Sequence, residues 1–296
     1  MLYLLLIAIL IIIMLLVVHF TRLVIYPKNH THDYIESKEL EQEAYDPDLL
    51  ESFDSRRVHI PSIFDYNLTG RIYLQDNPRA PFVLICHGIT VNYEASKKYT
   101  SLFLKKGYSV LVYDHRNHGY NDPMHTSLGY FEKFDAQGCI DYIYHNFQPK
   151  HVGIMGESMG AATALQLAAM DDRLAFCIED CGYSDAYQLI KHRAHHDHNI
   201  IIAQLVVLSN FFIKKIFKWS FKDVSIIHNI NDIKCPILFI HGEDDDYVPY
   251  KMVHEMHQAF KGKSMLYTVP KAKHAMAYKT DKIKYEAILD DFLEMI

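Results

Sequence analysis

The sequence is poor in glycine and cysteine, and it lacks any block of basic residues. Its 296 residues include 30 Lys and Arg against 36 Asp and Glu, a net charge of −6 without the basic footprint of a nucleic-acid-binding protein. The five cysteines are odd in number, and several lie in apolar runs, which suits reduced thiols better than a disulfide framework. Cys177 and Cys181 have no second pair to complete a zinc site, so we interpret them as core residues.

Charge is also missing from the N-terminus. No Lys, Arg, Asp or Glu occurs before Arg22, and about 20 apolar residues are what a helix needs to cross a bilayer. A cleaved signal peptide would need a basic start and a small-residue cleavage site, and neither is present. We therefore expect residues 1–20 to form a transmembrane anchor.

Basic residues lie on only one side of this apolar segment. None precedes it, whereas Arg22, Lys28 and Lys38 follow it. The positive-inside rule then predicts a single-pass protein of the cell membrane with the remaining chain on the cytoplasmic side. The reduced state expected of the cysteines favours the same orientation.

Two further regions follow the anchor. Residues 21–54 are acidic, with scattered apolar residues, and are typical of a polar connector. From residue 55 to 296, short apolar runs alternate with helical stretches, which predicts an α/β domain with a mostly parallel sheet covered by helices on both faces. Two more strongly alternating stretches, RRVHIPS and GRIYLQ, suit an antiparallel edge hairpin.

About 50 residues, roughly 184–232, interrupt this alternation and read as helix. A single crossover between parallel strands needs far fewer residues. We interpret the segment as a helical insertion above one end of the sheet.

The motif GIMGESMGAAT places Ser158 between an apolar strand and a helix rich in small residues. A serine at such a junction occupies a sharp, strained turn that points its hydroxyl outward. The backbone approaches itself closely two residues before and after, which explains Gly156 and Gly160. An incidental serine in a glycine-rich turn is the alternative, and the strand–turn–helix context argues against it.

Acidic and basic partners follow in chain order. FIHGEDDDYVP ends an apolar strand and brings Asp244, Asp245 and Asp246 to a loop at the same sheet edge, and the next strand is followed by His274. A histidine in this position accepts the serine proton, and a carboxylate orients the histidine. A solvated turn and one of 19 histidines would be the structural alternatives.

A further loop, ICHGIT, follows the strand FVLIC. It can present the backbone N–H of Ile89 beside that of Met159, the residue after the serine, as an oxyanion hole. A phosphate-binding loop is excluded because the glycine spacing of that motif is absent.

Together, CHGIT, YDHRNHG, GESMG, HGEDDDYVP and KAKHA resemble the α/β-hydrolase superfamily over residues 55–296. The sequence looks like bacterial serine hydrolases of the esterase and acylaminoacyl-peptidase type. The resemblance implies the pattern H-G-x-x-D-x-x-V-P, which assigns the acid to Asp245. Some relatives carry the acid one strand earlier, which would be Asp180.

The resemblance also implies acyl transfer to water through an acyl-serine, without a cofactor or metal. We expect a carboxylesterase or lipase-like enzyme acting on small or lipid-like esters. A peptidase or thioesterase of the same fold is the first alternative. A non-catalytic member that binds an acyl ligand is the second.

The insertion resembles the cap of this family. Its histidines His192, His195 and His196 share a helical face, but no strand or carboxylate fixes their geometry, so we do not expect a metal site. In the stretch 211–222, Phe212, Ile216 and Trp219 fall on one face, and the lysines broadly oppose them. This pattern fits a helix in a membrane interface, or an ordinary cap helix over the pocket.

Overall fold

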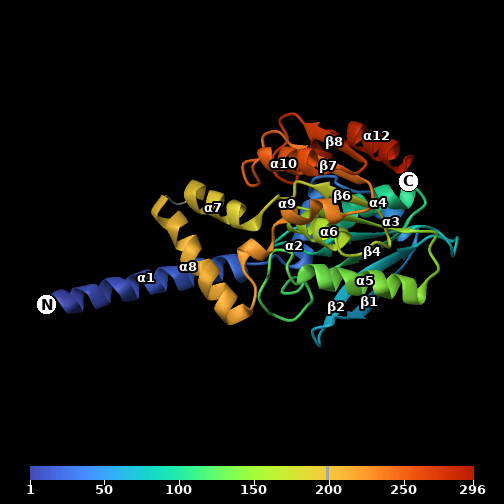
Figure 1. Cartoon of the computed structure of the whole chain (residues 1–296). Coiled ribbons are helices and arrows are strands. Elements are labelled where there is room, and N and C mark those ends of the chain that lie inside the picture. Colours follow the sequence, from blue (N-terminus) through green and yellow to red (C-terminus); the bar gives the residue numbers. More distant parts are fainter. Residues whose placement is uncertain (198–199) are drawn as a thin grey trace.

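The computed structural model describes residues 1–197 and 200–296 and contains an eight-stranded sheet in the order β1-β2-β4-β3-β5-β6-β7-β8 (Figure 1). The strands are β1 Asp54–Pro61, β2 Asn67–Leu74, β3 Phe82–Cys86, β4 Ser109–Tyr113, β5 Val152–Glu157, β6 Leu174–Asp180, β7 Ile237–Gly242 and β8 Ser264–Val269. β1 and β2 form the expected antiparallel edge hairpin, β2 also runs antiparallel to β4, and all remaining pairs are parallel. The predicted fold class is therefore confirmed.

Helices cover both faces of the sheet, because the central strands are buried along their whole length. One apolar cluster joins the sheet to α5 Glu132–Asn146, α6 Met159–Ala168 and α10 Lys251–Ala259. The other joins it to α4 Lys97–Lys105 and α12 Lys282–Leu293. Four strands, β3, β4, β5 and β7, have every residue buried, which explains their continuous apolar runs.

The N-terminal helix α1 spans Leu2–Ile25, longer than the anchor expected at 1–20. An 18-residue window of this helix has a mean hydropathy of 3.1, and the helix is long enough to cross a membrane. Its last turns are buried at Val17, Phe20 and Ile25, and the carbonyl of Ile25 accepts a hydrogen bond from the amide of Thr126. The end of α1 is therefore part of the folded domain.

The segment 21–54, predicted as a polar connector, is folded against the domain. This segment contains α2 His32–Glu41 and α3 Pro47–Glu51, and α2 packs against the short 3-10 helix Tyr93–Ser96. Ile35 and Leu50 are buried, and so is Glu39, which pairs with Lys279. The polar composition concealed this packing because buried ion pairs take the place of an apolar stripe.

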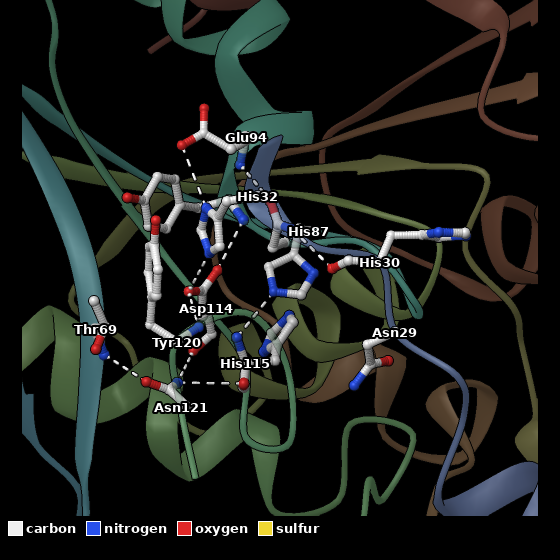
Figure 2. A network of polar contacts seen from close by, with 12 residues as sticks. Asn29, His30, His32, Thr69, His87, Glu94, Asp114, His115, Tyr120 and Asn121 are labelled. Atoms are coloured by element: carbon white, nitrogen blue, oxygen red, sulfur yellow. Dashed lines mark hydrogen bonds and ion pairs between the residues drawn. The ribbon is translucent and has the colours of Figure 1, made fainter. Parts of the chain in front are cut away.

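Buried His32 is the most constrained of these polar contacts (Figure 2). Its Nδ1 lies 3.3 Å from Glu94 Oε1, and its Nε2 lies 3.0 Å from Asp114 Oδ2. Burial opposes the charge on the ring, but the bonds to Asp114 and Glu94 outweigh it and raise the pKa of His32 to about 9. The imidazolium therefore ties α2 to the strand-end loops beyond β3 and β4.

The insertion expected at 184–232 contains α7 Ala186–Asp197, α8 Ile200–Phe217 and the short α9 Ile226–Asn229. The expected amphipathic helix over 211–222 is wrong in its second half. The helix ends at Phe217 because Lys218 adopts a left-handed φ of 65°, and Trp219 is fully buried rather than on a membrane-facing side.

The His32 contacts predict a pH-dependent stability. The pKa is about 9 in the folded state against 6.5 in the unfolded chain, so this contribution is complete below about pH 6.5 and is lost as the pH rises through 9. In detergent micelles, the thermal midpoint of the full-length protein should fall across that interval, and His32→Gln should flatten the fall. His59→Gln, at an exposed position on β1, should show the same fall of the thermal midpoint as the original protein. Equal slopes for His32→Gln and the original protein would contradict the assignment.

Candidate active site

Ser158 lies at the turn between β5 and α6, at the carboxyl edge of the sheet, and its side chain is largely buried. Its backbone angles are φ 57° and ψ −116°, a region that side-chain-bearing residues rarely occupy. A Cβ at Gly156 would lie 2.0 Å from the Gly160 carbonyl oxygen, and one at Gly160 would lie 2.0 Å from that of Cys86. Both glycines are therefore required by the close backbone approach that the sequence predicted.

The structure brings Ser158, His274 and Asp245 together in one chain of hydrogen bonds. His274 Nε2 lies 2.9 Å from Ser158 Oγ, and His274 Nδ1 lies 2.8 Å from Asp245 Oδ2. With Nδ1–H donated to the carboxylate, Nε2 is free to accept the serine proton. The loops after β7 and β8 supply Asp245 and His274, as their order in the chain indicates.

Asp245 is held by four donors. Its Oδ1 accepts the amides of Tyr247 and Val248 at 2.9 and 2.8 Å, and its Oδ2 lies 3.3 Å from Nε2 of buried His241. Burial disfavours its charge, but the bonds from His241 and His274 prevail and hold the pKa of Asp245 well below its usual range. The carboxylate is therefore ionised and fixed in orientation.

The other three candidate acids are not hydrogen-bonded to His274. Asp244 and Asp246 are exposed on the same loop. Asp180 is fully buried and accepts hydrogen bonds from Tyr99 at 3.0 Å and Tyr285 at 2.9 Å. Its pKa is raised to about 6, first by burial and then by the neighbouring Glu157. Of the four aspartates considered, Asp245 is the one hydrogen-bonded to His274.

A cavity of about 370 Å³ adjoins Ser158. Ile89 and Met159 both line it, which places the two residues expected to form the oxyanion hole beside the serine. Met159 is the first residue of α6, so its N–H has no acceptor four residues earlier within the helix. An oxygen bound beside Ser158 can accept from this amide.

Two neutral histidines fix the loop that carries Ile89. His87 Nδ1 lies 2.6 Å from the Gly88 carbonyl and Nε2 accepts the amide of His115 at 2.9 Å, while His118 Nε2 accepts the amide of Thr90 at 3.2 Å. Burial keeps the pKa of His87 well below its ordinary value. In Figure 2, His87 lies to the right of Asp114, and His115 lies below His32. In the sequence these histidines stand in the motifs CHGIT and YDHRNHG, but their role in fixing the loop could not be predicted.

A buried charge network, which the sequence analysis did not predict, holds the residue that precedes Ser158. Lys98 Nζ lies 2.5 Å from Oε2 of Glu157, the residue before Ser158, and Tyr99 Oη lies 2.6 Å from the same oxygen. Burial disfavours the charge on Glu157, but Lys98 outweighs it and lowers the pKa of Glu157. The network could have been suspected from the sequence, because Glu157 ends a buried apolar strand and a buried glutamate needs a counter-charge.

Within the part of the chain that the structure describes, one group has converging metal-ligand atoms: Cys181, Asp245 and His274. Burial raises the pKa of the Cys181 thiol well above its ordinary value, which opposes the thiolate that a metal prefers. Asp245 and His274 already bond each other. His192 and His196 stack on exposed positions of α7 and do not belong to this group.

The chain belongs to the α/β-hydrolase superfamily. A family described as alpha/beta hydrolase fold matches residues 81–182, and the dienelactone hydrolase family matches residues 221–290. The protein YqkD of Bacillus subtilis is 32% identical over 93% of this chain and 91% of its own length. The chain is accordingly an enzyme of the hydrolase type.

More distant relatives share parts of the chain. A lysophosphatidylserine lipase of Danio rerio is 26% identical over 63% of this chain and 50% of its own length. An esterase from Pyrococcus furiosus superposes with a TM-score of 0.68 at 24% identity, covering 85% of this chain and 96% of its own. An acylaminoacyl peptidase from Pyrococcus horikoshii gives 0.64 at 17% identity, over 83% and 42%.

The hydrogen bonds to His274 predict which aspartate matters. Asp245→Asn should lower hydrolytic turnover of p-nitrophenyl acetate by about 10⁴-fold, because the amide no longer holds the histidine in the required tautomer. Asp244→Asn and Asp246→Asn, on the same loop, are matched controls and should retain most of the turnover. Equal losses at all three positions would show that the loop is structural.

Proposed function

We propose that this protein is a serine hydrolase that cleaves carboxylic esters through an acyl-serine intermediate. The observation that carries the proposal is the chain of hydrogen bonds from Ser158 through His274 to ionised Asp245, set in a strained turn beside a cavity. Such a chain converts a weak alcohol nucleophile into a reactive one.

In the proposed reaction, Ser158 Oγ attacks the ester carbonyl carbon while His274 Nε2 takes its proton. The carbonyl oxygen becomes an oxyanion that the amides of Ile89 and Met159 stabilise. The carbon–oxygen bond to the alcohol then breaks, and His274 protonates the leaving alcohol. Water, deprotonated by His274, releases the acid from the acyl-serine, and the proton returns to Ser158. Asp245 stabilises the imidazolium in both halves.

The lining of the cavity supports a substrate with an apolar acyl chain. Its walls are predominantly apolar, including Leu128, Leu189 and Ile190, which suits an acyl chain. The relatives include an esterase and a lysophosphatidylserine lipase. The acylaminoacyl-peptidase neighbour keeps a peptidase as the alternative, and thioesterase or acyl-binding roles follow from the same cavity. A panel of p-nitrophenyl esters, acyl thioesters and peptide anilides distinguishes the esterase, peptidase, thioesterase and acyl-binding roles.

We also propose that α1 anchors the enzyme in the cell membrane with the catalytic domain on the cytoplasmic side. The apolar length of α1 supports the anchor, and the basic residues that follow it support the orientation. A buried, reduced state of the five cysteines is compatible with that compartment.

Ser158→Ala should abolish labelling by a fluorophosphonate probe and ester hydrolysis, since the attacking oxygen is removed. Ser184→Ala, at a buried serine that does not line the cavity, is the matched control and should label like the original protein. Unchanged thermal midpoints would show that both variants fold. An acyl-enzyme formed by Ser158→Ala would refute the assignment of the nucleophile.

Protease added to intact cells should leave the catalytic domain undigested, and digestion should follow once the membrane is permeabilised. Extraction of the protein by salt alone would contradict the anchor, because a membrane-spanning helix requires detergent. Digestion of the domain in intact cells would reverse the orientation and leave the chemistry unaffected.

A further inference from the structure

The end of the apolar N-terminal helix forms one wall of the cavity that holds Ser158. Five residues of this segment line the cavity: Phe20, Leu23, Val24, Pro27 and Lys28. Phe20, Leu23 and Val24 lie three or four residues apart, on one side of α1, and Pro27 and Lys28 follow just beyond its end. The same segment that can span a bilayer therefore faces the proposed nucleophile.

Another part of the wall belongs to the cap helix α7, through Leu189, Ile190, Arg193 and Ala194. α8 packs against both α1 and α7, so the three helices stand together beyond the sheet edge (Figure 1). The cavity lies where this helical unit meets the hydrolase domain.

The described part of α8 has two apolar faces where a water-exposed helix would have one. Its inner face is buried at Val206 and Ile213. Its outer face exposes Val207, Leu208 and Phe211, the last to 55%. Lysines 214 and 215 follow in the last turn, and cations at the end of an apolar helix are typical of a membrane interface. Because α8 lies against α1, a bilayer that surrounds α1 also covers this outer face.

We propose that the anchor is part of the substrate site, and that a single-chain acyl ester reaches Ser158 from the surrounding leaflet between α1 and the α7–α8 pair. Leu23 lines the cavity and yet remains 54% exposed, which marks an open side next to the membrane-spanning segment. A volume of about 370 Å³ is at the small end of ligand pockets and suits one chain rather than two.

The cavity is apolar along α1 itself and carries charge where Lys28, beyond the end of α1, and Arg193 and Asp197 of α7 approach it. Lys28 and Asp197 are exposed, so a polar head group there would remain in contact with water. The preferred substrate is accordingly a monoacyl lipid with its chain along α1. This inference rests on the proposed esterase activity and narrows it to esters held in a bilayer.

The test uses full-length enzyme in phosphatidylcholine vesicles, with p-nitrophenyl dodecanoate and p-nitrophenyl acetate as probes. Leu23→Trp fills the open side, so the ratio of kcat/KM for dodecanoate to that for acetate should fall roughly tenfold or more. Leu15→Trp, at an exposed position of α1 that does not line the cavity, is the matched control and should keep the original ratio. Equal ratios for the two tryptophan variants would overturn the proposal.

A smaller substitution covers the case in which tryptophan prevents folding. Leu23→Ala removes only apolar contact, so the ratio should fall several-fold, mainly through KM for dodecanoate, while Leu15→Ala should not change it. Loss of both esters in Ser158→Ala together with unchanged ratios in the Leu23 variants would refute the substrate path and leave the esterase proposal standing. Hydrolysis by Ser158→Ala would instead refute the esterase proposal.

A separate experiment tests whether the outer face of α8 contacts the bilayer. All five native cysteines are buried, so a cysteine introduced by Phe211→Cys can be labelled selectively with a polarity-sensitive dye. Its emission should shift to the blue in vesicles, whereas Lys261→Cys, exposed beyond α10, should report water. A water-like emission at position 211 would overturn the bilayer contact of α8.

Discussion

The close approach of backbone to backbone around Ser158 is the constraint on which the site depends. Gly160 lies against the carbonyl of Cys86, and this contact joins the start of α6 to the end of β3. It forces Ser158 into a left-handed conformation and sets Met159 beside Ile89 at one cavity. Strain of this kind costs about 1–3 kcal/mol and persists only where its surroundings determine the geometry. Here the fully buried strands β3 and β5 supply that rigidity.

The same turn requires charge to be buried beneath it. Glu157 precedes Ser158 and points into the opposite layer, where Lys98 neutralises it and Tyr99 bridges to Asp180. A buried ion pair is a weak source of net stability, but removal of one member leaves an uncompensated charge. The network is therefore better understood as fixing the position of the strand end than as strengthening the fold. It also explains why Asp180, in spite of its place at a strand end, is committed to a structural role.

Much of this arrangement can be predicted from the sequence, because parallel strands that are buried on both faces leave continuous apolar runs. Those runs locate the sheet edge, and Ser158, Asp245 and His274 follow from their positions just beyond it. The buried polar contacts could not be predicted. His32 lies in a segment of connector-like composition, and its partners Glu94 and Asp114 are 62 and 82 residues away. The burial of Trp219 was missed for a local reason: helical periodicity continues past Lys218, whereas the helix itself ends there.

The sequence alone predicts an anchor, a connector and an enzyme as separate parts, and the structure joins these three segments. The carbonyl of Ile25 is bonded to Thr126, the amide of His30 donates to Thr90, and His32 bridges the loops beyond β3 and β4. Thr90 follows Ile89, whose amide is proposed to bind the oxyanion. A displacement of α1 would therefore reach the loop that carries Ile89 through residues 26–30 and Thr90. This short path gives a physical reason for an apolar helix to be built into a hydrolase domain rather than tethered to it by a flexible chain.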